Sequence, residues 1–109
     1  MILPTHTLTG AMPAALITGM LAYANPCVTI SDRTTTYVPV WPPGYSARLL
    51  GQQVLVVSPT GEIFGVSGEV SLTGGVFEGE SASLVRDHAI NLAPACDVEP
   101  FWLVAAVSP

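Results

Sequence analysis

The residues that could carry chemistry are few and scattered along the chain. Asp87 and His88 form the one adjacent acid–imidazole pair, and such a pair can orient a general base in an enzyme. No nucleophile motif lies nearby, since Ser67 lacks the second glycine and the following helix of a nucleophile elbow. A hydrolase that combines the pair with a serine is therefore the least favoured reading. The sequence predicts a polar surface here and a protein that is not an enzyme.

Metal and cofactor sites are not indicated either. The two histidines and two cysteines have no ligand spacing and form no Cys-x-x-Cys motif. Gly74-Gly75 is not followed by the lysine of a phosphate-binding loop. Glu78 and Glu80 alternate around a glycine, which is more typical of a solvated loop than of a cation site. We expect no bound metal and no cofactor.

Cys27 and Cys96 are the only thiols, and each comes shortly after a proline. Their even number favours a disulfide between the second strand and the segment before the last strand. In the chain-entropy model, closing a loop of roughly 70 residues adds about 4 kcal/mol of stability. The alternative is two free cysteines packed as small apolar side chains. An oxidised pair favours an extracytoplasmic or virion location, and a reduced pair favours the cytoplasm.

Aromatic residues flank a rigid corner, Trp41-Pro42-Pro43-Gly44. Trp41 offers a large apolar surface and one hydrogen-bond donor. Together with Tyr45 and Arg48 it could form a ledge that binds a small anionic molecule. The alternative, which we favour, places Trp41 in the core at one end of the fold. These three residues are the candidate ligand-binding site that the sequence offers.

The elements that would position these residues are mostly strands. Valine and threonine are abundant, and ten glycines and ten prolines provide many turns. Four consecutive apolar residues from Val54 to Val57 predict a strand buried on both faces. At most one short helix is expected, near residues 81–89. Strands are expected at residues 15–23, 27–31, 36–41, 53–58, 63–66, 69–73 and 100–107, with a further short extended segment at 46–50.

This pattern predicts an all-β, single-domain fold. The expected architecture is a small antiparallel β-barrel, OB-like, of about six or seven short strands. A barrel is favoured because closure removes apolar sheet edges that would otherwise aggregate. Residues 1–14 would form an extended N-terminal arm, and residues 15–109 would form the barrel domain.

The composition is unusual for a short soluble chain. Only 10% of the 109 residues are charged, half are hydrophobic, and the formal net charge is −5. A typical soluble domain carries about 25% charged residues, and a chain this short cannot hide so much apolar surface by itself. We therefore expect part of the surface to meet another chain. Three scattered arginines without any lysine do not form the basic surface that nucleic acids require.

Targeting and membrane signals are not recognisable. The first cation is Arg33, whereas a signal peptide begins with a positive region. The most apolar early stretch, residues 11–24, is too short and too broken to span a bilayer. No membrane span is expected.

Several short motifs follow one another in a recognisable order over residues 15–107. They are Gly19-Met20-Leu21, Cys27-Val28-Thr29-Ile30, the Trp-Pro-Pro-Gly corner, the strand that begins at Gly68-Glu69-Val70 and ends in paired glycines, and Cys96 followed by Phe101-Trp102. This order resembles a family of small uncharacterised bacterial proteins, often exported or lipid-anchored. The resemblance implies a compact, OB-like β-barrel with the two cysteines close in space, and it supplies no catalytic residues that could be assigned to this sequence. Exported members carry a leader and an anchoring cysteine that this sequence lacks, so a phage-encoded relative fits it better.

These observations lead to two classes of function. The first is a non-enzymatic structural or interaction protein that acts within a multi-chain assembly, as a homo-oligomer or with other protein chains, for example in a virion. In that case the N-terminal arm would lie as a strap on a neighbouring chain. The alternative is a β-barrel that binds or sequesters a small molecule or a nucleotide signal, including an exported bacterial barrel of unknown ligand.

Overall fold

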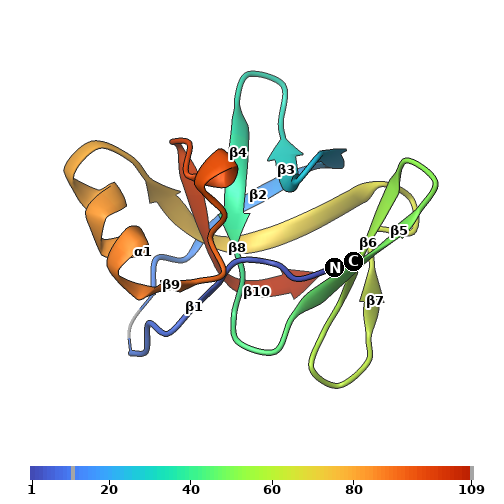
Figure 1. Cartoon of the computed structure of the whole chain (residues 1–109), viewed down its shortest axis with the longest axis horizontal. Helices are drawn as coiled ribbons and strands as arrows, with labels where there is room; N and C mark the ends of the chain where they lie inside the picture. Colours follow the sequence, from blue (N-terminus) through green and yellow to red (C-terminus); the bar gives the residue numbers. More distant parts are fainter. Residues whose placement is uncertain (11, 109) are drawn as a thin grey trace.

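Five strands form the body of the fold in the computed structural model, which describes residues 1–10 and 12–108. They are β2 (Ala15–Ala24), β3 (Cys27–Ser31), β4 (Thr36–Val40), β8 (Glu69–Phe77) and β10 (Phe101–Ser108). These strands are hydrogen-bonded in the order β10-β4-β3-β2-β8, and they close into a ring because β8 also pairs with β10 (Figure 1). The expected all-β fold in a single domain is confirmed.

Shorter elements are attached to this ring. A three-stranded sheet consists of β5 (Ser46–Leu50), β6 (Gln53–Val57) and β7 (Ile63–Phe64), while β1 (Thr5–His6) pairs with β9 (Ala89–Ile90). The helical elements are η1 (Gly79–Ser81), α1 (Ala82–His88) and η2 (Pro94–Cys96). The one α-helix in the described residues lies within the expected range 81–89. In Figure 1, α1 and the β5–β7 sheet lie at opposite ends of the long axis.

One pairing in the ring differs from the expected antiparallel arrangement. β10 runs parallel to β4, with Phe101 opposite Val38 and Leu103 opposite Val40. The other pairings in the ring are antiparallel. Parallel neighbours need a long connection, and here all of the chain from β5 to η2 lies between the two strands. The prediction of a purely antiparallel sheet is therefore wrong at this pair.

Alternation along β2 shows how the sequence builds the ring. Ile17 and Leu21 are buried, whereas Leu16 and Met20 are exposed. Successive side chains of a strand point to opposite faces of the sheet, so the first pair points into the ring and the second pair points away from it.

Two apolar cores result from this alternation. The first fills the ring and the space under the β5–β7 sheet, and Trp41, Ile30 and Leu72 are among its fully buried members. The second lies outside the ring, between β4 and β10 on one side and the segment from α1 to η2 on the other. Its buried members are Cys27, Val38, Val40, Ala82, Val85, Cys96, Phe101 and Leu103.

The N-terminal segment is attached to its own chain. Leu3 and His6 are only 2% and 4% exposed. The backbone N–H of His6 donates to the carbonyl oxygen of Trp41 at 2.9 Å, and the terminal ammonium of Met1 donates to the carbonyl oxygen of Ala47 at 2.8 Å. These contacts place residues 1–6 along the body of the same molecule, whereas a strap on a neighbouring chain was expected.

Candidate binding surfaces

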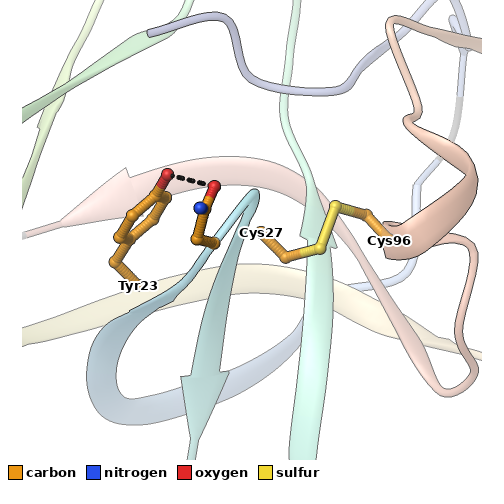
Figure 2. The surroundings of a disulfide bond; sticks show 4 residues. Tyr23, Cys27 and Cys96 are labelled. Atoms are coloured by element: carbon orange, nitrogen blue, oxygen red, sulfur yellow. Dashed lines mark hydrogen bonds between the residues drawn. A yellow bond between two sulfur atoms is a disulfide. The ribbon is translucent and has the colours of Figure 1, made fainter.

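A disulfide joins Cys27, at the start of β3, to Cys96 in η2 (Figure 2). The two residues are 69 positions apart in the sequence, their Cα atoms are 5.6 Å apart, and both are buried. The cysteine pairing expected from the sequence is confirmed. Beside it, the hydroxyl of Tyr23 donates to Oδ1 of Asn25 at 2.8 Å, across the turn between β2 and β3. The disulfide attaches η2 to the outside of the ring next to this turn.

A groove of about 340 Å³ opens beside the disulfide. Residues 24–26 of the β2–β3 turn form one side, Tyr37 and Val38 of β4 lie along it, and Val98 and Glu99 form the far side. Most of the lining is apolar, and its size falls within the range of small-molecule sites, roughly 300–1,000 Å³. The sequence did not indicate this groove, because its walls come from three distant segments.

Tyr37 connects the groove to the core inside the ring. Its side chain packs edge-on against Trp102, with ring centroids 5.6 Å apart and an interplanar angle of 74°. A change in the position of Tyr37 would therefore alter the surroundings of a buried tryptophan.

Charged residues hold the far side of the groove. Arg86 of α1 contacts Oδ1 of Asp97 at 2.6 Å and Oε2 of Glu99 at 3.0 Å, and its guanidinium lies 5.4 Å from the ring centroid of Phe101. The backbone N–H of Gly79 donates to the other carboxylate oxygen of Glu99 at 2.5 Å. This bond, and then the bond from Arg86, lower the pKa of Glu99 below its ordinary value of 4.5. Hydrogen bonds to both carboxylates raise the pKa of Arg86.

Of the three residues that the sequence suggested for ligand binding, Trp41 and Tyr45 come together and Arg48 does not. Trp41 is fully buried in the first core, and the ring of Tyr45 stacks on it with centroids 6.2 Å apart. Burial, and then the charge of Glu62, raise the pKa of the Tyr45 hydroxyl. Ala47 of β5 points inward, so Arg48, the next residue, is exposed on the opposite face of the strand. Trp41 therefore lies in the core, as the favoured alternative from the sequence proposed.

Asp87 and His88 lie at the end of α1, far from the serine considered with them. The Nδ1 of His88 donates to the carbonyl oxygen of Leu84 at 3.0 Å, one helical turn earlier. Ser67 lies between β7 and β8, at the opposite end of the molecule from α1 (Figure 1). The structure therefore brings no acid–imidazole–serine arrangement together from these residues.

A second candidate surface is the outer face of the β5–β7 sheet. Ile2 bridges to Ser46, which lies opposite Val57, which in turn lies opposite Ile63. Residues that are opposite one another share a face of the sheet, so these four form a row across it. The outer sheet face consists of Ile2, Ser46, Arg48, Leu50, Gln53, Leu55, Val57 and Ile63.

This outer sheet face is apolar and open to solvent. Ile2, Leu50 and Ile63 are 77%, 62% and 51% exposed. Leu55 and Val57 are only half-buried, so the expectation that β6 is buried on both faces is wrong. The middle strand of this face is less open than its rim, since Gln53, Leu55 and Val57 are all partly buried.

The amount of exposed surface is ordinary for a monomer, whereas the outer sheet face carries few charged residues. The accessible area is 5770 Å², close to the roughly 5,700 Å² expected for a monomer of this mass. Arg48 is the one charged residue of the outer sheet face. The outer sheet face is one of several places with exposed large apolar side chains, since Leu16, Val66 and Val98 are also exposed elsewhere on the molecule.

Comparisons with known proteins give no indication of the function. No family model, curated protein or solved structure matches the chain. Across residues 1–10 and 12–108, no helix has the length and apolar character needed to cross a membrane. Over the same residues, no three His, Cys, Asp or Glu side chains gather as metal ligands would.

Proposed function

We propose that the protein is a non-enzymatic interaction protein that acts within a multi-chain assembly. The observation that carries this proposal is the outer sheet face, on which Ile2, Leu50 and Ile63 are exposed beside a single cation. Large apolar side chains gathered on one face are typical of protein contact surfaces. Moving such a side chain fully out of water contributes about 1.5–3 kcal/mol, so a partner that covers several of them is held without any strong ion pair.

A rigid scaffold supports such a role. The five paired strands close into a ring, and the disulfide attaches the segment around η2 to it. The disulfide also favours an oxidising compartment, such as the outside of a cell or a virion. These features agree with a small structural component that contacts other chains through a preformed surface.

A charge placed on the outer sheet face tests the proposal. Leu50→Lys puts an ammonium beside Arg48, and Leu84→Lys, at an exposed position of α1, is the matched control. By light scattering after size exclusion, we expect the unmodified, oxidised protein to have a mass above that of one chain. Leu50→Lys should shift it toward the monomer, and Leu84→Lys should not. A strictly monomeric unmodified protein at high concentration would count against the proposal.

The groove beside the disulfide supports a second function, the binding of a small molecule. Its lining combines Tyr37 and Val98 with the carboxylate of Glu99, and no Lys or Arg is among the described residues that form it. A site of this composition favours an uncharged, largely apolar molecule over a nucleotide phosphate.

Tryptophan fluorescence provides the test of this second function. A ligand that contacts Tyr37 changes the environment of Trp102, which packs against it. In a screen of small apolar molecules we expect a saturable change in emission that Val98→Asp abolishes and Leu84→Asp preserves. An unchanged spectrum over the whole screen would exclude the groove as a ligand site.

A further inference from the structure

We infer that the open edge of β7 pairs with the β7 edge of a second copy of this chain and forms a two-fold dimer. The inference goes beyond the proposed function, because it concerns the edge of the sheet and not its outer face. Within the described residues β7 pairs only with β6. Its other edge therefore carries backbone groups with no neighbouring strand, and the side chain of Ile63 is half exposed there.

The backbone hydrogen bonds show which groups point toward the open edge. The N–H of Ser58 donates to the carbonyl oxygen of Glu62 at 2.9 Å, and the next pair in this register is Val57 opposite Ile63. Antiparallel pairs alternate between hydrogen-bonded and non-hydrogen-bonded types. The pair of Val57 and Ile63 is thus the non-hydrogen-bonded type. The N–H and C=O of Ile63 consequently point away from β6, toward the open edge.

The N–H and C=O of Ile63 in one copy are complementary to the C=O and N–H of Ile63 in a second copy. When two copies meet around a two-fold axis at Ile63, each Ile63 N–H donates to the carbonyl oxygen of the partner's Ile63. An isologous contact of this kind closes after two copies and does not propagate into a fibre. Addition of a strand to a free sheet edge is also a common mode of recognition between chains.

The surrounding side chains fit the same arrangement. Pairing at Ile63 joins the row of Ile2, Ser46, Val57 and Ile63 in one copy to the same row in the other. None of these four residues is charged, and the nearest charge on the strand, Glu62, would lie opposite Phe64 of the second copy and not opposite its Glu62. β7 contains no proline or lysine, which often protect free edges. A hollow of about 280 Å³, lined by Val66 and its neighbours, leaves room beside β7 for the second strand.

A cysteine at the proposed axis gives the most direct test. In a hydrogen-bonded antiparallel pair the Cα atoms lie about 5.5 Å apart, which suits a disulfide. We expect Ile63→Cys to form a covalent dimer on mild oxidation, with peptide mapping showing a bond between two copies of position 63. Leu84→Cys, at an exposed position of α1, should form no covalent dimer under the same conditions.

Ile63→Pro tests the same hydrogen bonds without a new thiol. It removes the N–H that points to the partner and spares the ladder to β6, where that N–H takes no part. In sedimentation, the mass at high concentration should fall from twice 11.3 kDa to 11.3 kDa, while Ile63→Val keeps the dimer. Circular dichroism controls for the fold.

The outcomes separate this inference from the proposed contact face. An oligomer that survives Ile63→Pro and does not cross-link at position 63 overturns the edge pairing. If Leu50→Lys disperses that oligomer, the outer sheet face still stands as a contact surface. A dimer that is lost in Ile63→Pro but unaffected by Leu50→Lys supports the edge and argues against the face.

Discussion

Gly74 is the position at which the backbone most strictly requires a glycine. It has a φ of +149°, and a Cβ at this position would lie 1.8 Å from the carbonyl oxygen of Leu103 on the neighbouring strand. We expect Gly74→Ala to lower the free energy of unfolding by about 3 kcal/mol or more, because β8 and β10 must separate. Gly51→Ala, with a φ of +63° and no atom within 4 Å of the new Cβ, should lower it by about 1 kcal/mol. Urea unfolding curves measure both, and equal losses would contradict this account.

Some residue roles were predictable from the sequence and others were not. The even number of cysteines favoured the pairing of Cys27 with Cys96, and a core position was the favoured alternative for Trp41. The candidate site failed to assemble at Arg48, which lies on the outer face of β5. In a regular strand Tyr45 and Arg48 fall on opposite faces, since three positions separate them. That signal was present in the sequence.

The segment around η2 should make the fold sensitive to acid through Glu99. Its pKa is lowered in the folded state, so the stability that it contributes is present above its ordinary value of 4.5 and is lost as the pH falls below it. We expect the melting temperature of the unmodified protein to fall more steeply in acid than that of Glu99→Gln. Asp32, whose pKa is lowered by the backbone N–H groups of Thr34 and Thr35, leaves some acid dependence in both proteins.

A double variant can separate the contributions of Gly79 and Arg86 to this acid sensitivity. The hydrogen bond from the N–H of Gly79 is the largest single cause of the lowered pKa, and Arg86 adds to it through its own hydrogen bond and its charge. In an Arg86→Met background, Glu99→Gln should therefore still flatten the acid response, although by less. An acid response that is identical with and without Glu99 would refute the assignment.

The disulfide should be the strongest single attachment of η2 to the ring. It spans 69 residues, and in the chain-entropy model a loop of this length corresponds to about 4 kcal/mol of stability. We expect the double variant Cys27→Ala, Cys96→Ala to lose stability of that order in urea. Amides of residues 93–98 should also exchange faster with solvent. Unchanged exchange in this segment would show that Arg86 alone holds it.

Long strands were predictable because alternation along one strand depends on local sequence. The pairing of strands was harder to predict. The parallel neighbours β4 and β10, for example, are separated by more than half of the chain. The two-residue strands β1 and β9 are too short for any periodicity to mark them, whereas β7 lies within the strand expected at residues 63–66. The groove and the open β7 edge depend on those same pairings, which explains why the sequence did not indicate either surface.

For the whole molecule, the low charge content is the property from which the account begins. The sequence predicted an excess of apolar surface but not its position, because composition carries no information about faces. The register of β5, β6 and β7 places part of that excess on one sheet face and one free edge. We propose that other chains contact the protein at these two surfaces.

Sedimentation equilibrium of the unmodified, oxidised protein over a wide range of concentrations is the most direct measurement. The account predicts an average mass that rises with concentration from 11.3 kDa to at least twice that value. A mass of 11.3 kDa at every concentration would contradict it.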